Sequence, residues 1–264
     1  MSKPWADDPA ASMPLLSAGD PAPTYAENRG AHSPFLVVSD HAGRAIPRRL
    51  GRLGLTNAEL DQHIAWDIGT AELALRLARD LGACAILQAF SRLVIDCNRA
   101  PGHVQSIMAV SDGVPIPGNL GLTAADAEAR RVAIHAPYHS CIAEEIEARA
   151  RSGLPTLLIC IHSFTQIWQG AARPWHVGVL HGEPSPVSRA LLDLLREEGD
   201  LVVGDNQPYV MDGTDYTAPH HAWARGWDVI ELEVRQDLLL DAAGPQRFAG
   251  LFARLAPQAL GDSV

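Results

Sequence analysis

Residues 156–161 read TLLICI, and His162 and Ser163 follow directly. A short run of leucine and β-branched side chains without polar alternation is typical of a strand that is buried on both faces of a sheet. Similar runs recur at residues 35–38, 84–87, 93–95, 177–180, 201–203 and 229–234. Because helices cover both faces of such a sheet, the pattern predicts a mainly parallel sheet between two helical layers.

Helical patterns fill the intervals between these runs, at residues 59–81, 123–151, 185–198 and 245–260. Thr123 followed by Asp126 resembles a capping box, and Ser185 before Pro186 places a capping residue ahead of a proline that suits the first helical position. Pro137 is predicted to kink the second of these helices. The alternation of strands and helices predicts an α/β three-layer sandwich with a mainly parallel mixed sheet.

The first part of the chain differs in composition from the rest. Residues 1–33 are rich in proline, alanine and aspartate, which predicts an N-terminal arm that is poorly ordered or wraps around the remainder. Residues 34–264 contain no repeat or linker, so we expect one α/β domain there. A Gly-, Pro- and Ser-rich segment at 98–121 is too long for an ordinary connection, and we expect its residues 101–121 to close over a pocket.

Composition and charge exclude several classes of protein. The formal net charge of −10 disfavours binding to nucleic acid or to an anionic membrane surface. No apolar run approaches the roughly 18 residues of a membrane-spanning helix, and the N-terminus does not resemble a signal peptide. The four cysteines form no pairing pattern, which is typical of reduced thiols. We therefore expect a cytoplasmic protein, either a monomer or a homodimer, that acts on a small molecule.

Polar side chains stand near the ends of several predicted strands. In open α/β sheets, ligands bind in the crevice beyond the carboxyl ends of the strands. The runs at 35–38, 93–95 and 156–161 are followed by histidine, aspartate or arginine, and the run at 229–234 contains two glutamates. These residues are His41, Asp96, Arg99, His162, Glu231 and Glu233.

His41 and His162 are candidate metal ligands. Neutral imidazole is a preferred ligand of zinc, and a hydrolytic zinc site uses three protein ligands and leaves one position open. Asp67 is a candidate for the third ligand; His63, four residues earlier and on the same face of a predicted helix, is the alternative. The competing interpretation is that both strand-end histidines only form hydrogen bonds to the backbone.

Glu233 lies inside an apolar strand, where a carboxylate is costly unless it is paired or functional. It is a candidate general base; the alternatives are an ion pair with Arg235, or Glu231 as the base. Arg92 and Arg99 present the rigid fork that suits a carboxylate, and Asp96 is expected to orient one of them or a histidine. His221, beside Tyr216 in the chain, is expected to line the pocket with it.

Other catalytic motifs are missing from the sequence. It contains no GxGxxG after a predicted strand, no GxxxxGK[ST], no GxSxG and no HExxH. Five other motifs occur in order. Together they resemble the N-formylglutamate amidohydrolase family, in the branch usually labelled "N-formylglutamate amidohydrolase-like". These are SDHAG with IP (39–43, 46–47), HIAWDIG (63–69), SRLVIDCNR (91–99), IHSF (161–164) and EVRQDL (233–238). The resemblance covers roughly residues 34–258.

The resemblance implies a phosphorylase/hydrolase-like fold, similar to zinc carboxypeptidases, and hydrolysis of N-formyl-L-glutamate to formate and glutamate with one zinc ion. Carried over residue by residue, it implies that a metal bound by His41, Asp67 and His162 activates water. It further implies Glu233 as the general base. The sequence departs from zinc carboxypeptidases at Arg44, where those enzymes carry a glutamate three residues after the first histidine.

The same resemblance suggests how a substrate would be held. Arg92 would stabilise the developing oxyanion beside the carbonyl, and Asn98 with Arg99 would hold a substrate carboxylate. Asp96, Tyr216 and His221 complete the predicted substrate-binding set. Two alternatives stay open: a deacylase or carboxypeptidase-like hydrolase of another N-acyl amino acid, and a non-catalytic carboxylate-binding protein on the same fold.

Overall fold

The structure is a computed structural model that describes residues 14–182 and 185–261. Its centre is a seven-stranded sheet in the order β1, β3, β2, β6, β11, β9, β10. The bounds are β1 Thr24–Glu27, β2 Phe35–Ser39, β3 Cys84–Gln88, β6 Leu157–Phe164, β9 Val177–Leu180, β10 Val203–Asp205 and β11 Val229–Arg235. Neighbouring strands are parallel except at β1–β3 and β9–β11. The predicted mixed, mainly parallel sheet is therefore confirmed.

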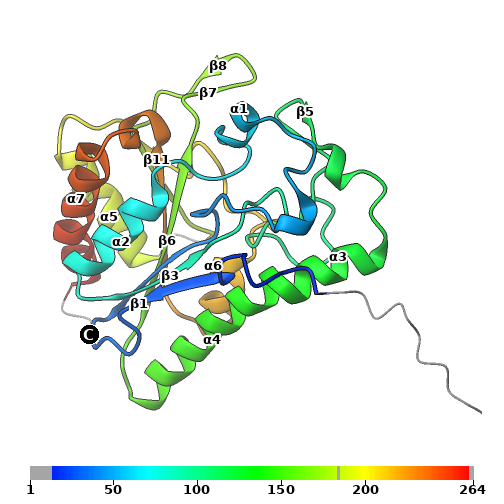
Figure 1. The fold of residues 1–264 in the computed structure, drawn as a ribbon. Coiled ribbons are helices and arrows are strands. Elements are labelled where there is room, and N and C mark those ends of the chain that lie inside the picture. Colours follow the sequence, from blue (N-terminus) through cyan, green and yellow to red (C-terminus); the bar gives the residue numbers. More distant parts are fainter. Residues whose placement is uncertain (1–13, 183–184, 262–264) are drawn as a thin grey trace, which may run out of the picture.

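Helices cover both faces of this sheet (Figure 1). Those longer than four residues are α2 Thr70–Asp80, α3 Ala124–Arg130, α4 Ala136–Arg151, α5 Pro186–Glu197, α6 Thr217–His221 and α7 Ala243–Leu260. One buried apolar cluster joins α2, α5 and α7 to one face of the sheet, and a second joins α4 and α6 to the other. The predicted three layers are thus present, and the strands are buried on both faces as the sequence indicates.

Within the predicted arm, β1 pairs with β3 as an antiparallel edge strand, so the sheet begins before residue 34. The boundary predicted at residue 33 is therefore wrong for residues 24–27. The segment TYAE is too short and too polar to stand out as a strand in the sequence, and it is specified by its pairing with β3. The first 13 residues of the predicted arm lie outside the described residues.

Residues 93–95 were predicted as a strand and instead form a turn. The hydroxyl of Ser91 accepts a hydrogen bond from the backbone N–H of Leu93 at 3.1 Å, and Val94 N–H donates to the Ser91 carbonyl at 2.9 Å. This local bonding competes with a strand ladder. Leu93, Val94 and Ile95 are all buried, and burial alone explains the apolar run.

Two predicted helices differ in detail from the structure. The pattern over 59–81 is divided into α1, Asn57–Leu60, and α2, with nine non-helical residues between them. The pattern over 123–151 begins with the expected capping box at Thr123, and a π-helical turn at Arg131–His135 interrupts it directly before Ala136 and Pro137. Pro137 is the second residue of α4, and its missing N–H falls at the junction with the π-helical turn. In the sheet, β10 starts at Val203, two residues later than predicted.

The long segment at 98–121 contains a small hairpin, β4 Val110–Ser111 with β5 Val114–Pro115. Its base is anchored by the buried guanidinium of Arg130, which donates to the carbonyls of Val94 and Gly118 and to Asn119 Oδ1. A second hairpin, β7 Ile167–Trp168 with β8 Ala171–Ala172, follows β6. Within the described ranges, no helix combines the length and the hydrophobicity needed to cross a membrane.

Candidate active site

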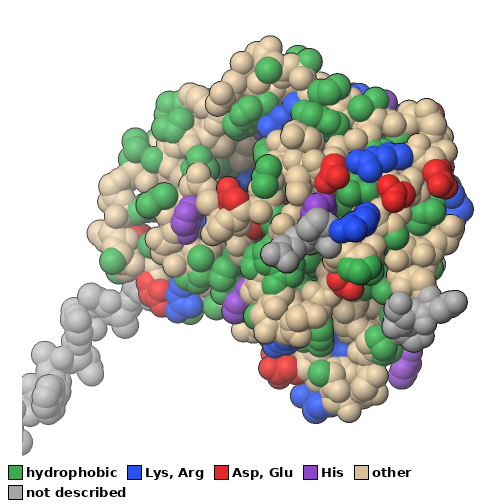
Figure 2. Space-filling view, turned by 180° about the vertical axis from the view of Figure 1, so that it is seen from behind, with side chains coloured by type: hydrophobic (Ala, Val, Ile, Leu, Met, Phe, Trp, Pro, Cys, Tyr) green, Lys and Arg blue, Asp and Glu red, His purple; other side chains and the backbone are tan. Residues whose placement is uncertain are grey.

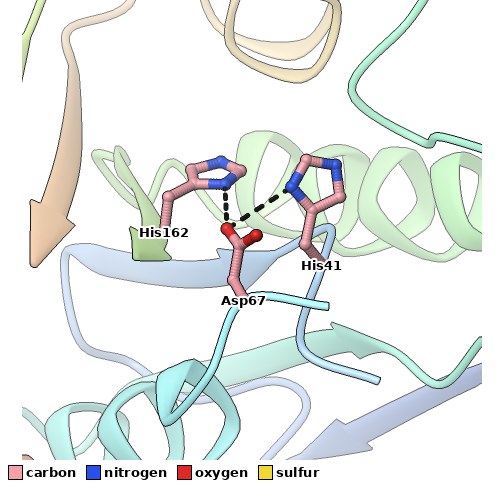
Figure 3. Close-up of side chains that lie close together, drawn as sticks. All are labelled: His41, Asp67 and His162. Atoms are coloured by element: carbon pink, nitrogen blue, oxygen red, sulfur yellow. Dashed lines mark hydrogen bonds and ion pairs between the residues drawn. The ribbon is translucent and has the colours of Figure 1, made fainter. Parts of the chain in front are cut away.

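His41, Asp67 and His162 converge beside the central strands (Figure 3). His41 follows the end of β2, and His162 lies inside β6, which continues to Phe164. Asp67 Oδ2 lies 3.0 Å from His162 Nδ1 and 3.4 Å from His41 Nδ1. All three side chains are buried, and one nitrogen or oxygen from each lies within 4.8 Å of the others.

The break between α1 and α2 places Asp67 in this group. The backbone N–H of Asp67 donates to the carbonyl of His41 at 2.9 Å, which ties the segment to the end of β2. Gly69 then starts α2 at φ +84, where a side chain would collide with Leu239. The prediction that His63 and Asp67 share a helical face is wrong, because the residues between α1 and α2 are not helical. His63 Nε2 lies 3.2 Å from Asp112 Oδ2 instead. The geometry thus brings Asp67 rather than His63 to the two histidines.

The donor set and its hydrogen bonds fit a metal ion such as zinc. His41 Nε2 lies 2.8 Å from Asp96 Oδ1, so a proton on Nε2 leaves the lone pair of Nδ1 directed toward Asp67 and His162. That Nδ1 is buried and has no hydrogen-bond partner among the described residues. A carboxylate that orients a histidine in this way is a common support of metal ligands. Two imidazole nitrogens and a carboxylate are ligands that zinc prefers.

Arg92 links the two aspartates of the group. Its guanidinium lies 2.7 Å from Asp96 Oδ2 and 3.4 Å from Asp67 Oδ1. Burial opposes ionisation of Asp67, but His41, His162 and Arg92 together hold the pKa of Asp67 below its usual range. Arg92 and His41 likewise outweigh burial and hold the pKa of Asp96 well below its usual range. Both carboxylates are therefore ionised, as a ligand and an orienting group must be.

Glu231 and Glu233 stand on the face of β11 that looks toward the same site. Glu233 pairs in register with His162 on the neighbouring strand, so the two side chains share a face of the sheet. Burial raises the pKa of Glu233 well above its usual range and that of Glu231 to about 7. Arg235 forms an ion pair with Asp237 at 2.7 Å. The alternative that Glu233 is paired with Arg235 is therefore wrong. Glu233 Oε2 has no hydrogen-bond partner among the described residues.

Asn98 and Arg99 lie together at the site, but the carboxylate of Asp215 already forms hydrogen bonds with both. Asp215 Oδ1 accepts from Asn98 Nδ2 at 3.2 Å and from Arg99 Nη1 at 3.3 Å. Asn98 Oδ1 in turn accepts the backbone N–H groups of Tyr216 and Thr217 at 2.9 and 3.0 Å. The sequence does not indicate Asp215, because it reaches this pair across more than a hundred residues of chain.

Tyr216 and His221 are not among the residues that line the cavity, so the prediction that their side chains do so is wrong. His221 is buried under α4, where its Nε2 lies 2.9 Å from His139 Nδ1. His139 Nε2 is 2.9 Å from the Cys97 carbonyl. These histidines therefore support the backbone just before Asn98. The apolar spacing of α4 indicates burial there but not the polar pairing.

Asp40 is a second residue that the sequence left without a role. It is buried, its Oδ1 accepts from the Thr217 hydroxyl at 3.0 Å, and its Oδ2 lies 3.6 Å from His162 Nε2. Unlike the 2.8 Å contact of Asp96 with His41, this separation is no hydrogen bond, and both atoms have no hydrogen-bond partner among the described residues. Its position directly before His41 in the chain is the only sequence signal that points to it.

The group opens into a cavity of about 970 Å³. Its lining includes His41, Asp67, Arg92, Asp96, Asn98, Arg99, His162, Glu231 and Glu233, together with five residues between 105 and 113 and six between 208 and 215. On the face of the molecule shown in Figure 2, acidic, basic and hydrophobic side chains are interspersed and the upper half is hollowed. The volume is at the upper end of the range typical of small-molecule sites.

The chain is a hydrolase of amide C–N bonds, because its buried histidines, aspartate and glutamates lie in a chain that matches a family of amidohydrolases. Residues 33–240 match the model of the N-formylglutamate amidohydrolase family. The chain belongs to this family, as its ordered motifs predict.

Solved structures agree with this placement. A gene product of Agrobacterium tumefaciens is similar at 33% identity and a TM-score of 0.91, over 94% of this chain and 99% of that one. An N-formylglutamate amidohydrolase from Ralstonia eutropha is similar at 20% identity and a TM-score of 0.63, over 89% of this chain and 97% of that one. The second likeness shows the fold alone. No curated protein gives a significant match to the sequence.

Proposed function

We propose that this protein is a metal-dependent amidohydrolase that cleaves the formamide of a small N-formyl compound, releasing formate and a free amine. N-formyl amino acids, of which N-formyl-L-glutamate is the family's namesake, are the first class to test. The observation that carries the proposal is the convergence of His41, Asp67 and His162 beside an unpartnered, buried Glu233.

His41, Asp67 and His162 would hold the ion, and zinc suits these ligands. A bound zinc ion supplies Lewis-acid polarisation of a carbonyl and lowers the pKa of water. Asp96 would keep the imidazole of His41 oriented from behind. Support for this ligand set comes from the unpartnered Nδ1 of His41, which already faces the other two ligands.

Glu233 would accept a proton from the attacking water and return it to the departing amine. Its position supports this role, because it faces the cavity from the strand that pairs with His162. The raised pKa makes its carboxylate a stronger base than that of an exposed glutamate. Arg92, partly exposed to the cavity, would stabilise the oxyanion that develops on the carbonyl oxygen.

The volume of the cavity favours a second candidate. At about 970 Å³ it is far larger than an N-formyl amino acid, so an amidohydrolase for a larger N-acyl group on the same metal and base is the alternative.

Formate release tests the proposal. Chelated protein is assayed with N-formyl compounds and their N-acetyl counterparts, with and without added zinc. We expect formate only in the presence of zinc. Release of acetate without formate selects the second candidate, and no release of either acid from zinc-bound protein rejects both.

A further inference from the structure

The ionised groups of the cavity are unevenly balanced. Its lining contains seven carboxylic side chains and two guanidinium groups. Arg92 is paired with Asp67 and Asp96, and Arg99 is paired with Asp215. Even with Glu231 and Glu233 protonated and a divalent ion bound, negative charges outnumber positive ones. Among the described lining residues, both guanidinium groups already contact carboxylates of the protein, Arg92 at Asp67 and Asp96 and Arg99 at Asp215.

Arg173 is a further cation close to the cavity, but it does not change this balance of charged lining groups. Arg173 lies over the rings of Phe164, Trp168 and Tyr209, at 5.9, 5.2 and 4.7 Å from their ring centres. It donates to the Tyr209 hydroxyl at 3.0 Å and is not part of the lining. Arg173 is therefore not counted among the charged groups of the lining.

Asp215 is built into its position. One of its oxygens accepts from both Asn98 and Arg99, and the other accepts the backbone N–H of Asp212 at 3.2 Å. A substrate carboxylate that binds Asn98 and Arg99 would have to displace Asp215 from its hydrogen bonds with both residues. If Asp215 stayed in place, the two negative charges would repel each other. A cationic group would instead meet Asp215 and the exposed Asp212, which both line the cavity.

We propose that Asp215 determines the charge specificity of this enzyme: it fills the Asn98–Arg99 pair as an internal carboxylate, so that the cavity accepts amides whose amine portion carries an ammonium or guanidinium group. This inference rests on the proposed function and names the substrate class of that same site. The base and the metal-binding residues act on the amide, while Asp215 selects the charge of the amine portion.

Three formamides of equal length test the inference on the zinc-loaded full chain. N-formyl-1,4-diaminobutane ends in an ammonium group, N-formyl-4-aminobutanamide is neutral, and N-formyl-4-aminobutanoate ends in a carboxylate. We expect kcat/KM for the ammonium compound to exceed that for the carboxylate compound at least tenfold, with the neutral compound between them. A preference for the carboxylate compound in the wild-type protein overturns the inference.

Substitution of Asp215 assigns the effect to this residue. Asp215→Asn keeps the size of the side chain and removes its charge, and Asp215→Ala leaves the Asn98–Arg99 pair open. Both should lower the ammonium-to-carboxylate ratio at least tenfold. Asp112→Asn is the matched control, because it removes a carboxylate from the same cavity without touching that pair, and it should change the ratio less than threefold. Equal ratios in the wild-type and Asp215 variants would reject the assignment.

Binding separates this inference from the proposed function. In a Glu233→Gln variant loaded with zinc, calorimetry measures the affinity for each of the three amides without turnover. If no amide is hydrolysed by the wild-type protein, the proposed function fails, but a tenfold stronger binding of the ammonium compound still supports the role of Asp215. If the variant binds the ammonium and carboxylate compounds equally, or binds neither, the inference fails whatever the hydrolysis shows.

Discussion

Replacing Asp96 by asparagine perturbs the metal site without removing a ligand. Asp96 accepts from His41 Nε2 at 2.8 Å, from Arg92 Nη2 at 2.7 Å and from the Asn98 backbone N–H at 2.9 Å. An amide has one acceptor oxygen, so its NH₂ group must face either His41 or Arg92, both of which are donors. If it faces His41, the imidazole proton moves to Nδ1 and blocks the ligand lone pair.

Loss of such an orienting carboxylate typically weakens metal binding 10- to 100-fold, about 1.4–2.7 kcal/mol. We therefore expect Asp96→Asn to raise the zinc Kd by that factor, measured by competition with a chromophoric chelator. Asp112→Asn removes a carboxylate that lines the same cavity and does not contact His41, and its zinc Kd should stay within threefold of the wild-type value. A zinc Kd for Asp96→Asn equal to that of the control would refute the orienting role.

Three further predictions follow from the same contacts. Glu233→Gln should lower kcat by about 10²–10⁴-fold while zinc content is unchanged; full turnover in this variant contradicts its role as base. Burial lowers the pKa of His221 to about 3, below the unfolded value of about 6.5. The neutral form of His221 therefore stabilises the fold above pH 6.5, and this stability is lost as the pH falls toward 3. Between pH 7 and 5.5 this amounts to about 1 kcal/mol, and His221→Gln should reduce the loss seen in urea unfolding; an unchanged pH slope in that variant counts against it. Gly69→Ala should cost about 1–3 kcal/mol more than Gly82→Ala, because both residues have positive φ but only Gly69 packs against a neighbouring side chain; equal urea midpoints would contradict this.

The sequence predicts those parts of the fold that depend on local patterns. The apolar runs that became β2, β3, β6, β9 and β11 are nearly continuous because both of their faces are buried, and the capping residues of α3 and α5 form local hydrogen bonds that the sequence displays. His41 and His162 are found in the same way, because each lies in or directly after such a run.

The features that the sequence does not predict depend on distant contacts. Residues 93–95 look like a strand because they are buried, whereas the Ser91 hydroxyl sets their conformation. Residues 61–69 look helical, but the hydrogen bond from Asp67 to the His41 carbonyl and the packing of Gly69 on Leu239 break the helix. Asp215 contacts Asn98 from 117 positions away, and no periodicity carries that information.

Arg130 anchors the long segment at 98–121 close to both of its ends. Its buried guanidinium bonds to Val94, just before the segment, and to Gly118 and Asn119 near its end, so the chain on either side of the segment is fastened to the helical layer. The β4–β5 hairpin between these contacts borders the cavity and is held by other groups, such as Asn119, which donates to the Met108 carbonyl at 2.7 Å, and His63, which lies 3.2 Å from Asp112. The size of the acceptable substrate can therefore change by insertion or deletion in the hairpin, while the histidines, Asp67 and Glu233 keep their places on the sheet.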